Sequence, residues 1–266
     1  MINANVSRAL AQARSVRVTA LKYQLHLSIP SDRRQPVRGR LSATFDLSAA
    51  DTPLVFDFTP SIDHLETIVA NGEETTNAGG EDEGRVRIPV GRLRRGANTI
   101  TFDFRAGSGA LHRQDEFLYS LFVPARASAV FPCFDQPDLK ARWRLTLLIP
   151  HEWTALSNGR QIAGTSLPDG LMVTFEETAP LPTYLFAVVA GRFSVETAER
   201  QGRRFQMLHR ETDQTTLREN RDALFDLHAQ ALAQLEDYTG IPYPFDKCDF
   251  VLIPAFQFSG MVSAVI

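Results

Sequence analysis

Residues 23–29 read Tyr-Gln-Leu-His-Leu-Ser-Ile, with an apolar side chain at every second position. Residues 143–149, Trp-Arg-Leu-Thr-Leu-Leu-Ile, carry apolar residues at the same spacing. Successive side chains of a β-strand point to opposite faces, so this period places one side of the strand in a core and the other in water. Both stretches are therefore predicted to be strands of a sheet with one buried face.

The alternation dominates from Val16 to about Gly191. Further runs of this kind lie at residues 41–47, 54–58, 100–104 and 171–175. Turn-forming dipeptides separate the runs, namely Asn71-Gly72, Gly79-Gly80, Arg95-Gly96, Asn158-Gly159 and Asp169-Gly170. Many short strands with frequent turns predict a mainly β, largely antiparallel domain of sandwich or saddle type with little helix.

The period changes after about residue 200. Thr216 with Glu219 has the form of a capping box, apolar residues then follow at helical spacing, and Gly240 gives a stop signal. We expect one long helix over Thr216–Thr239 and a short apolar strand over residues 247–256. A lone helix and strand cannot bury both of their faces. The sequence therefore predicts a β domain over residues 1–200 and the incomplete start of a second domain over 201–266.

Composition excludes several classes of protein. The 266 residues include 28 basic and 31 acidic ones, a net charge of -3, which gives no electrostatic case for nucleic acid or an anionic membrane as partner. No apolar stretch is long enough to cross a membrane, and residues 1–14 lack the apolar segment of a secretion signal. The two cysteines, Cys133 and Cys248, form no C-x-x-C pair, and reduced thiols suit a cytoplasmic protein.

Few residues suggest catalysis or metal binding. His151-Glu152 opens like the zinc motif H-E-x-x-H, but the fifth position is Ala155 and the context indicates a turn at a strand end. His228 is expected to be a surface or packed histidine of the long helix. The carboxylates of Asp135 and Asp138 flank a proline turn, where aspartate commonly caps backbone amides. We therefore expect no catalytic residue and no metal ligand in this chain.

Three stretches carry a resemblance to a known family. The first is residues 130–141, Val-Phe-Pro-Cys-Phe-Asp-Gln-Pro-Asp-Leu-Lys-Ala, with the turn at residues 153–158; the second is 181–191, Leu-Pro-Thr-Tyr-Leu-Phe-Ala-Val-Val-Ala-Gly. The third runs from Tyr-Thr-Gly-Ile-Pro-Tyr-Pro-Phe-Asp-Lys at residues 238–247 into Ser-Gly-Met at 259–261. In this order they resemble the aminopeptidase N family of zinc metallopeptidases, peptidase family M1 of the gluzincins.

The resemblance implies a saddle-like antiparallel β-sandwich followed by the opening of a thermolysin-like α/β catalytic domain. It also implies a parent enzyme that removes N-terminal residues from peptides with a zinc ion held by H-E-x-x-H and a later glutamate. In the family's exopeptidase motif, G-[AG]-M backbone groups align the peptide as an added strand. Ser259, Gly260 and Met261 match that remnant and are the substrate-binding candidates by resemblance.

The sequence departs from the family pattern at two positions. Val262 stands where the family's amine-binding glutamate is expected, and valine cannot pair with an ammonium group. Leu121 stands where many members have Gln or Glu in the first specificity pocket. The chain also ends at Ile266, before any zinc motif. We therefore expect an N-terminal fragment of a zinc aminopeptidase that binds no zinc and cleaves no peptide by itself.

Two other interpretations stay open. The chain could be a non-catalytic binding or scaffold module, or a subunit completed by a separate zinc domain. Residues 201–266 are apolar enough to contact a missing catalytic domain or a second copy of the chain. The same residues are expected to be less stable than the β domain, because most helix stability comes from packing the apolar stripe.

Overall fold

The computed structural model describes residues 6–77, 84–245 and 247–253. The chain divides into two compact units, Met1–Gly191 and Arg192–Ile266. The first is built mainly from strands, and the second from strands and one long helix. The fold class predicted from the alternation is confirmed. The domain assignment of residues 1–200 and 201–266 stays a prediction, since compactness alone does not define a domain.

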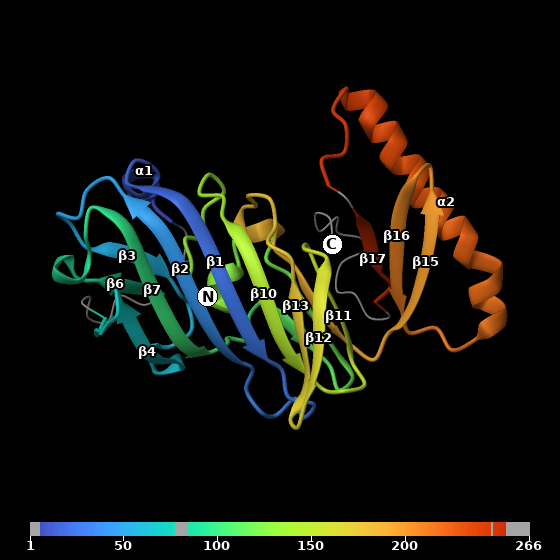
Figure 1. Ribbon diagram of the computed structural model, residues 1–266, viewed down its shortest axis with the longest axis horizontal. Helices are drawn as coiled ribbons and strands as arrows, with labels where there is room; N and C mark the ends of the chain where they lie inside the picture. Colours follow the sequence, from blue (N-terminus) through green and yellow to red (C-terminus); the bar gives the residue numbers. More distant parts are fainter. Residues whose placement is uncertain (1–5, 78–83, 246, 254–266) are drawn as a thin grey trace. The chain divides into compact units, whose positions relative to one another are not determined.

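The first unit is centred on an eight-stranded sheet of order β12-β13-β10-β1-β2-β7-β4-β5 (Figure 1). Its strands are β1 Val18–Ser28, β2 Arg38–Leu47, β4 Leu65–Ala70, β5 Glu73–Glu74, β7 Gly96–Arg105, β10 Arg142–Ile149, β12 Gln161–Leu167 and β13 Gly170–Phe175. Neighbours in this sheet run antiparallel except β1 and β10, which pair in parallel with Leu25 opposite Leu145. The sequence did not predict the parallel pair, which joins strands more than a hundred residues apart.

The core forms on one face of this sheet. The alternating residues of β1 are buried as predicted, Leu25 completely, whereas His26 is exposed. Gly39 of β2 lies under the ring of Phe104, and a Cβ at Gly39 would come within 2.3 Å of that ring. The sheet thus requires glycine at this register position because the aromatic ring fills the space.

Smaller sheets complete the first unit. A four-stranded sheet has the order β11-β14-β9-β8, and β3 pairs with β6. The bounds are β3 Leu54–Asp57, β6 Arg85–Ile88, β8 Leu111–Arg113, β9 Phe117–Ser120, β11 Thr154–Ser157 and β14 Val188–Gly191, with 3-10 turns at Ile62–His64, Val90–Arg92, Ala127–Ala129 and Thr183–Leu185. Phe56 of β3 contacts Phe102 of the large sheet, with 5.0 Å between ring centroids. The strand predicted at residues 54–58 is therefore correct, but β3 is buried on both faces rather than on one.

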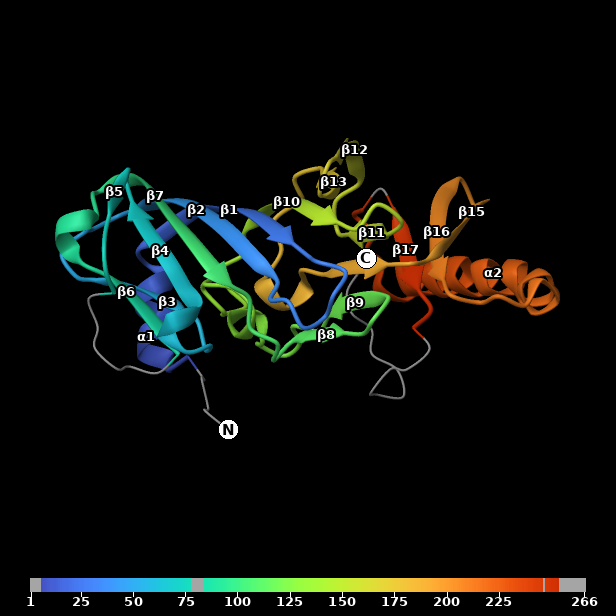
Figure 2. The ribbon, with the colours of Figure 1, turned by 90° about the horizontal axis from the view of Figure 1, so that it is seen from below.

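A helix that the sequence did not predict precedes the first strand. This helix, α1, spans Arg8–Ser15 and begins after Ser7, whose hydroxyl accepts a hydrogen bond from the backbone N–H of Leu10. In Figure 2, α1 lies beside β3, to which Arg14 donates hydrogen bonds. Arg14 is its one buried residue, so α1 has no buried apolar stripe that a sequence pattern could reveal.

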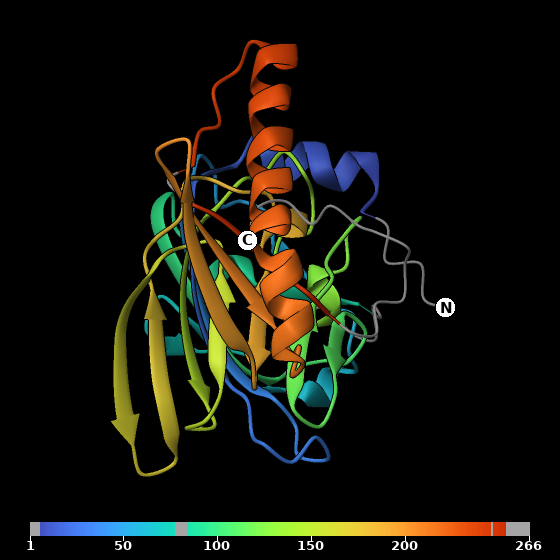
Figure 3. The same cartoon turned by 90° about the vertical axis from the view of Figure 1, so that its right-hand side faces the viewer.

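The second unit contains a three-stranded sheet of order β15-β16-β17 and the long helix α2 (Figure 3). The bounds are β15 Ser194–Arg200, β16 Arg203–His209, α2 Gln214–Thr239 and β17 Cys248–Val251. Phe225 and Ala229 of α2 pack on Phe205 and Met207 of β16. This cluster is the core of the second unit.

Two boundaries in the second unit differ from the sequence prediction. Helix α2 begins at Gln214, because the carboxylate of Asp213 accepts the Thr215 N–H at 2.8 Å, so the capping box predicted at Thr216 does not start the helix. The helix ends at Thr239, as predicted, and Gly240 follows it in the left-handed conformation that glycine favours. Strand β17 covers four residues of the predicted 247–256 strand, of which 254–256 lie outside the described residues.

Candidate functional site

The predicted substrate-binding remnant cannot be placed. Ser259, Gly260 and Met261, with Val262, lie outside the described residues. Their match to the exopeptidase motif therefore stays a prediction. The structure describes residues 240–245 and 247–253, which precede them.

Polar contacts hold the segment before β17 in place. Lys247 Nζ lies 2.6 Å from Asp249 Oδ2, and both side chains are largely buried. Burial raises the pKa of Asp249, although the Lys247 ammonium acts in the opposite direction. The hydroxyl of Tyr243 donates to the carbonyl of Lys247 at 2.9 Å, and burial raises the pKa of that phenol. These contacts fix the start of β17, which pairs in parallel with β16.

Helix α2 has apolar side chains on two faces. The inner face packs on the sheet through Phe225 and Ala229, as described above. A second set remains exposed, and we call it the α2 outer stripe: Leu227, Leu235, Tyr238 and Ile241, the last just past the helix end, with exposed fractions of 61%, 59%, 87% and 66%. Large apolar side chains that are exposed on one surface often mark a contact with another protein or chain segment.

The two candidate histidines, His151 and His228, lie in structural environments. His151 and Glu152 form an exposed turn between β10 and β11, as predicted, and Ala155 lies inside β11. His228 Nδ1 lies 2.8 Å from the carbonyl of Leu224, and its ring stacks on Phe250 at 3.8 Å. Across the three described ranges, no group of three His, Cys, Asp or Glu side chains could hold a metal ion.

Asp135 and Asp138 bind neighbouring parts of the fold, as the sequence indicated. Asp135 is buried and accepts the Ser128 backbone N–H at 3.0 Å and the Thr183 hydroxyl at 2.6 Å. Burial raises the pKa of Asp135 against the effect of those hydrogen bonds. Asp138 accepts the Ser15 hydroxyl of α1. Both carboxylates therefore stabilise the turn that carries them.

One buried ion pair beside this turn was not predicted from the sequence. Arg14 of α1 and Asp57 of β3 are 2% and 3% exposed, and the atoms Nη1 and Oδ2 lie 2.7 Å apart. A single charged residue in the otherwise apolar run Leu-Val-Phe-Asp-Phe was the available signal, because a charge buried in such a strand requires a partner.

Leu121, expected in place of a polar pocket residue, is 4% exposed. Its backbone N–H donates to the carbonyl of Ala110 at 2.9 Å. A buried leucine offers no hydrogen-bonding group to a substrate. The structure thus describes an apolar, enclosed environment at the position where the family's Gln or Glu is expected.

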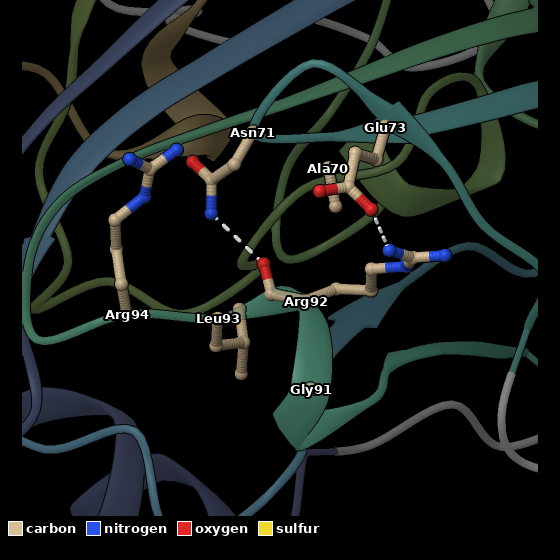
Figure 4. Close-up of a pocket in the computed structure, with 7 residues that line it drawn as sticks. All are labelled: Ala70, Asn71, Glu73, Gly91, Arg92, Leu93 and Arg94. Atoms are coloured by element: carbon tan, nitrogen blue, oxygen red, sulfur yellow. Dashed lines mark hydrogen bonds and ion pairs between the residues drawn. The ribbon is translucent and has the colours of Figure 1, made fainter.

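Two of the cavities that the described residues line bear on a possible site. One of about 220 Å³ lies between the β4–β5 turn and residues 91–94 (Figure 4). The amide of Asn71 donates to the Arg92 carbonyl at 2.8 Å, and Arg92 pairs with Glu73. These residues largely satisfy one another, which is typical of a structural turn.

The other cavity, of about 650 Å³, lies on the exposed face of the large sheet. Leu148, Leu167 and Met172 supply its apolar part, and Arg40 forms two hydrogen bonds with Asp103 at 2.6 and 2.8 Å. The lining of this cavity also includes His26 and Ser28, and the Thr67 hydroxyl donates to Asp103 at 2.6 Å, so Arg40 and Thr67 both bind the Asp103 carboxylate.

Comparisons with known proteins identify what these elements resemble. A family model described as the peptidase M1 N-terminal domain matches residues 19–185. Aminopeptidase M1-B from Oryza sativa subsp. japonica is 36% identical over 141 residues, 53% of this chain. Aminopeptidase N from Streptomyces lividans is 25% identical over 276 aligned residues, 99% of this chain. Aminopeptidase Q from Acinonyx jubatus is 30% identical over 151 residues, 54% of this chain.

The relatives are much longer than this chain. The matched region is 16% of the rice protein, 31% of the Streptomyces protein and 15% of the Acinonyx protein. Within the described residues, no helix has the length and apolar character to cross a membrane.

Proposed function

The chain belongs to the family of peptidase M1 N-terminal domains, and on that premise we propose that it forms the leading part of a zinc aminopeptidase. The match over residues 19–185 carries this proposal, together with relatives that are named as aminopeptidases. In this role the β domain supports a catalytic domain that begins in residues 201–266. The peptide substrate belongs to the complete enzyme.

The α2 outer stripe supports a role that requires further protein. Leu227, Leu235 and Tyr238 are each more than half exposed. A stand-alone module would expose this apolar surface to water at a cost of roughly 25 cal/mol for each Å² left unburied. The remaining part of a catalytic domain, on the same chain or on a separate one, would cover the stripe. This observation favours completion by a zinc domain over an independent scaffold.

The zinc of the family does not fit the described residues. A catalytic zinc takes about three protein ligands and keeps a further position open. The described ranges bring no such set together, and His151-Glu152 is in a turn with an alanine at the fifth position. The proposal is that the metal binds elsewhere in the complete enzyme.

We propose that this chain alone does not hydrolyse peptides. The test is hydrolysis of an aminoacyl p-nitroanilide by the purified chain with added zinc, with aminopeptidase N of Streptomyces lividans as the positive control. The expected rate equals the rate without protein. The Val262→Glu variant is expected to be equally inactive, because it returns an amine anchor without a metal. Turnover above background by either protein would overturn the proposal.

A further inference from the structure

The attachment of α1 to the β domain is concentrated in one side chain. All eight residues of α1 are described, and Arg14 is the buried one. An isolated helix of this length is not stable in water, because nucleation costs more than so few hydrogen bonds return. The helix therefore depends on its anchor, and the anchor is a charged group rather than an apolar stripe.

The guanidinium of Arg14 lies in a socket with acceptors on several sides. Its Nε donates to the Val55 carbonyl at 3.1 Å, and Nη1 and Nη2 donate to the two carboxylate oxygens of Asp57 at 2.7 and 2.8 Å. Nη1 also lies 3.3 Å from the side-chain oxygen of Gln136, and the ring of Phe134 lies 5.4 Å from the guanidinium carbon. We call these four groups the guanidinium socket. Their planar, forked arrangement matches arginine and not lysine.

The β domain holds the socket in place by contacts that do not involve α1. The backbone N–H of Asp135 donates to Asp57 Oδ2 at 3.0 Å, and Asp57 exchanges two backbone hydrogen bonds with Cys133. Phe134 stacks on Phe56 with 4.3 Å between ring centroids. The carboxylate and the aromatic wall are thus oriented before any guanidinium arrives, as a preorganised site requires.

Weaker contacts complete the attachment. Gln136 Nε2 donates to the Ala11 carbonyl at 3.1 Å and to the Ser15 hydroxyl at 3.2 Å. Ser15 in turn donates to the exposed Asp138. These are neutral or solvent-exposed hydrogen bonds, which stabilise less than hydrogen bonds between buried charged groups, so they do not replace the buried ion pair.

The family match begins at residue 19, after α1 has ended. The socket groups, in contrast, lie within the matched residues 19–185. The family domain thus contains the acceptor site, and the segment before it supplies the cation. We propose that the β domain carries a binding site for an alkylguanidinium group, which α1 fills with Arg14, and that α1 is a latch which opens as a unit while the β domain stays folded.

Chemical rescue of the full chain tests the socket. The Arg14→Ala variant keeps Cβ and loses the atoms that ethylguanidinium supplies. Millimolar ethylguanidinium is expected to raise the thermal midpoint of this variant by several degrees, while ethylammonium at the same concentration is not. In the matched double variant, Arg14→Ala with Asp57→Asn, ethylguanidinium is expected to have no such effect. Equal effects of the two cations, or undiminished rescue in the double variant, would overturn the socket.

Hydrogen exchange of the unmodified chain tests the latch without any substitution. The α1 amides are expected to exchange through an opening that leaves the amides of β1 and β10 protected, and that is much more frequent than global unfolding. In Arg14→Ala, the α1 amides should lose protection and should not regain it when ethylguanidinium fills the socket. If α1 and β1 exchange through the same opening in the unmodified chain, α1 is an integral part of the domain and the latch is wrong.

Discussion

Arg14 and Asp57 are 43 residues apart in sequence and form two hydrogen bonds of 2.7 and 2.8 Å inside the β domain. Removing one partner of a buried ion pair leaves an uncompensated charge and costs about 3–5 kcal/mol of stability. Arg14→Met is expected to lose stability of this order in urea unfolding. Arg14→Met with Asp57→Asn should lose clearly less, because no buried charge then lacks its partner.

A matched control is Arg34→Met, because the Arg34–Asp32 pair lies on the surface with Arg34 87% exposed. Exposed pairs contribute about 0–1 kcal/mol. The interpretation of the Arg14–Asp57 pair is wrong if the two single arginine variants lose similar amounts, or if the double variant is as unstable as Arg14→Met alone.

The buried carboxyl of Asp135 predicts a specific pH dependence. Burial raises its pKa in the folded state, so its protonated form is favoured by folding. The stabilisation that protonated Asp135 gives the folded state is therefore fully present below the unfolded pKa of about 3.9. It is lost as the pH rises through the folded pKa. The stability of the native protein relative to Asp135→Asn should fall as the pH rises through this window, in urea titrations at a series of pH values.

Asp138 provides the control of opposite sign. Burial acts against the shift, but hydrogen bonds from Ser15 and Gln136 lower the pKa of Asp138. The stability of the native protein relative to Asp138→Asn should therefore rise as the pH rises from below the folded pKa to above the unfolded one. Parallel pH profiles for the two variants would show that the surroundings of Asp135 are not as described.

The contact between Gly39 and Phe104 predicts an intolerance of any side chain at Gly39. A Cβ there would lie 2.3 Å from the ring, so Gly39→Ala must displace Phe104 in the core. Overpacking of this kind typically costs about 1–3 kcal/mol. Gly91→Ala is the control, since nothing lies within 4 Å of its Cβ position. Thermal unfolding should show a clear loss for the first variant and little change for the second.

The α2 outer stripe predicts self-association of the chain when it is purified alone. The expected observation is a sedimentation coefficient that increases with protein concentration. Leu227→Glu with Leu235→Glu should abolish that increase, since charges replace the exposed apolar groups. Gln161→Glu adds a charge at an exposed position of β12, away from helix α2, and should leave the concentration-dependent increase unchanged. Association that persists in the double variant would locate the contact elsewhere.

The sequence predicted the parts of the fold that depend on local periodicity. Tyr23 and Leu25 alternate with polar residues, and the structure buries them in β1 as expected. Gly240 ends α2 because its backbone is left-handed, a property readable from residue type. The parallel pairing of β1 with β10 depends on the approach of distant segments, for which a single sequence carries no local signal.

In the candidate site, too, features set by local sequence were predicted and features set by distant contacts were not. The positions of Asp135 and Asp138 in a structural turn were predicted, because a proline turn with aspartates has its own local chemistry. Helix α1 was missed because its anchor is one arginine that meets a carboxylate from another strand. The placement of Ser259, Gly260 and Met261 stays a prediction.

The zinc content of the purified chain tests the central claim most directly. The chain should be equilibrated with zinc, dialysed, and measured by inductively coupled plasma mass spectrometry, with aminopeptidase N of Streptomyces lividans treated in the same way. The account of this chain as the leading part of an aminopeptidase, whose metal binds elsewhere, predicts far less than one zinc per chain and about one in the control. One tightly bound zinc per chain would contradict it.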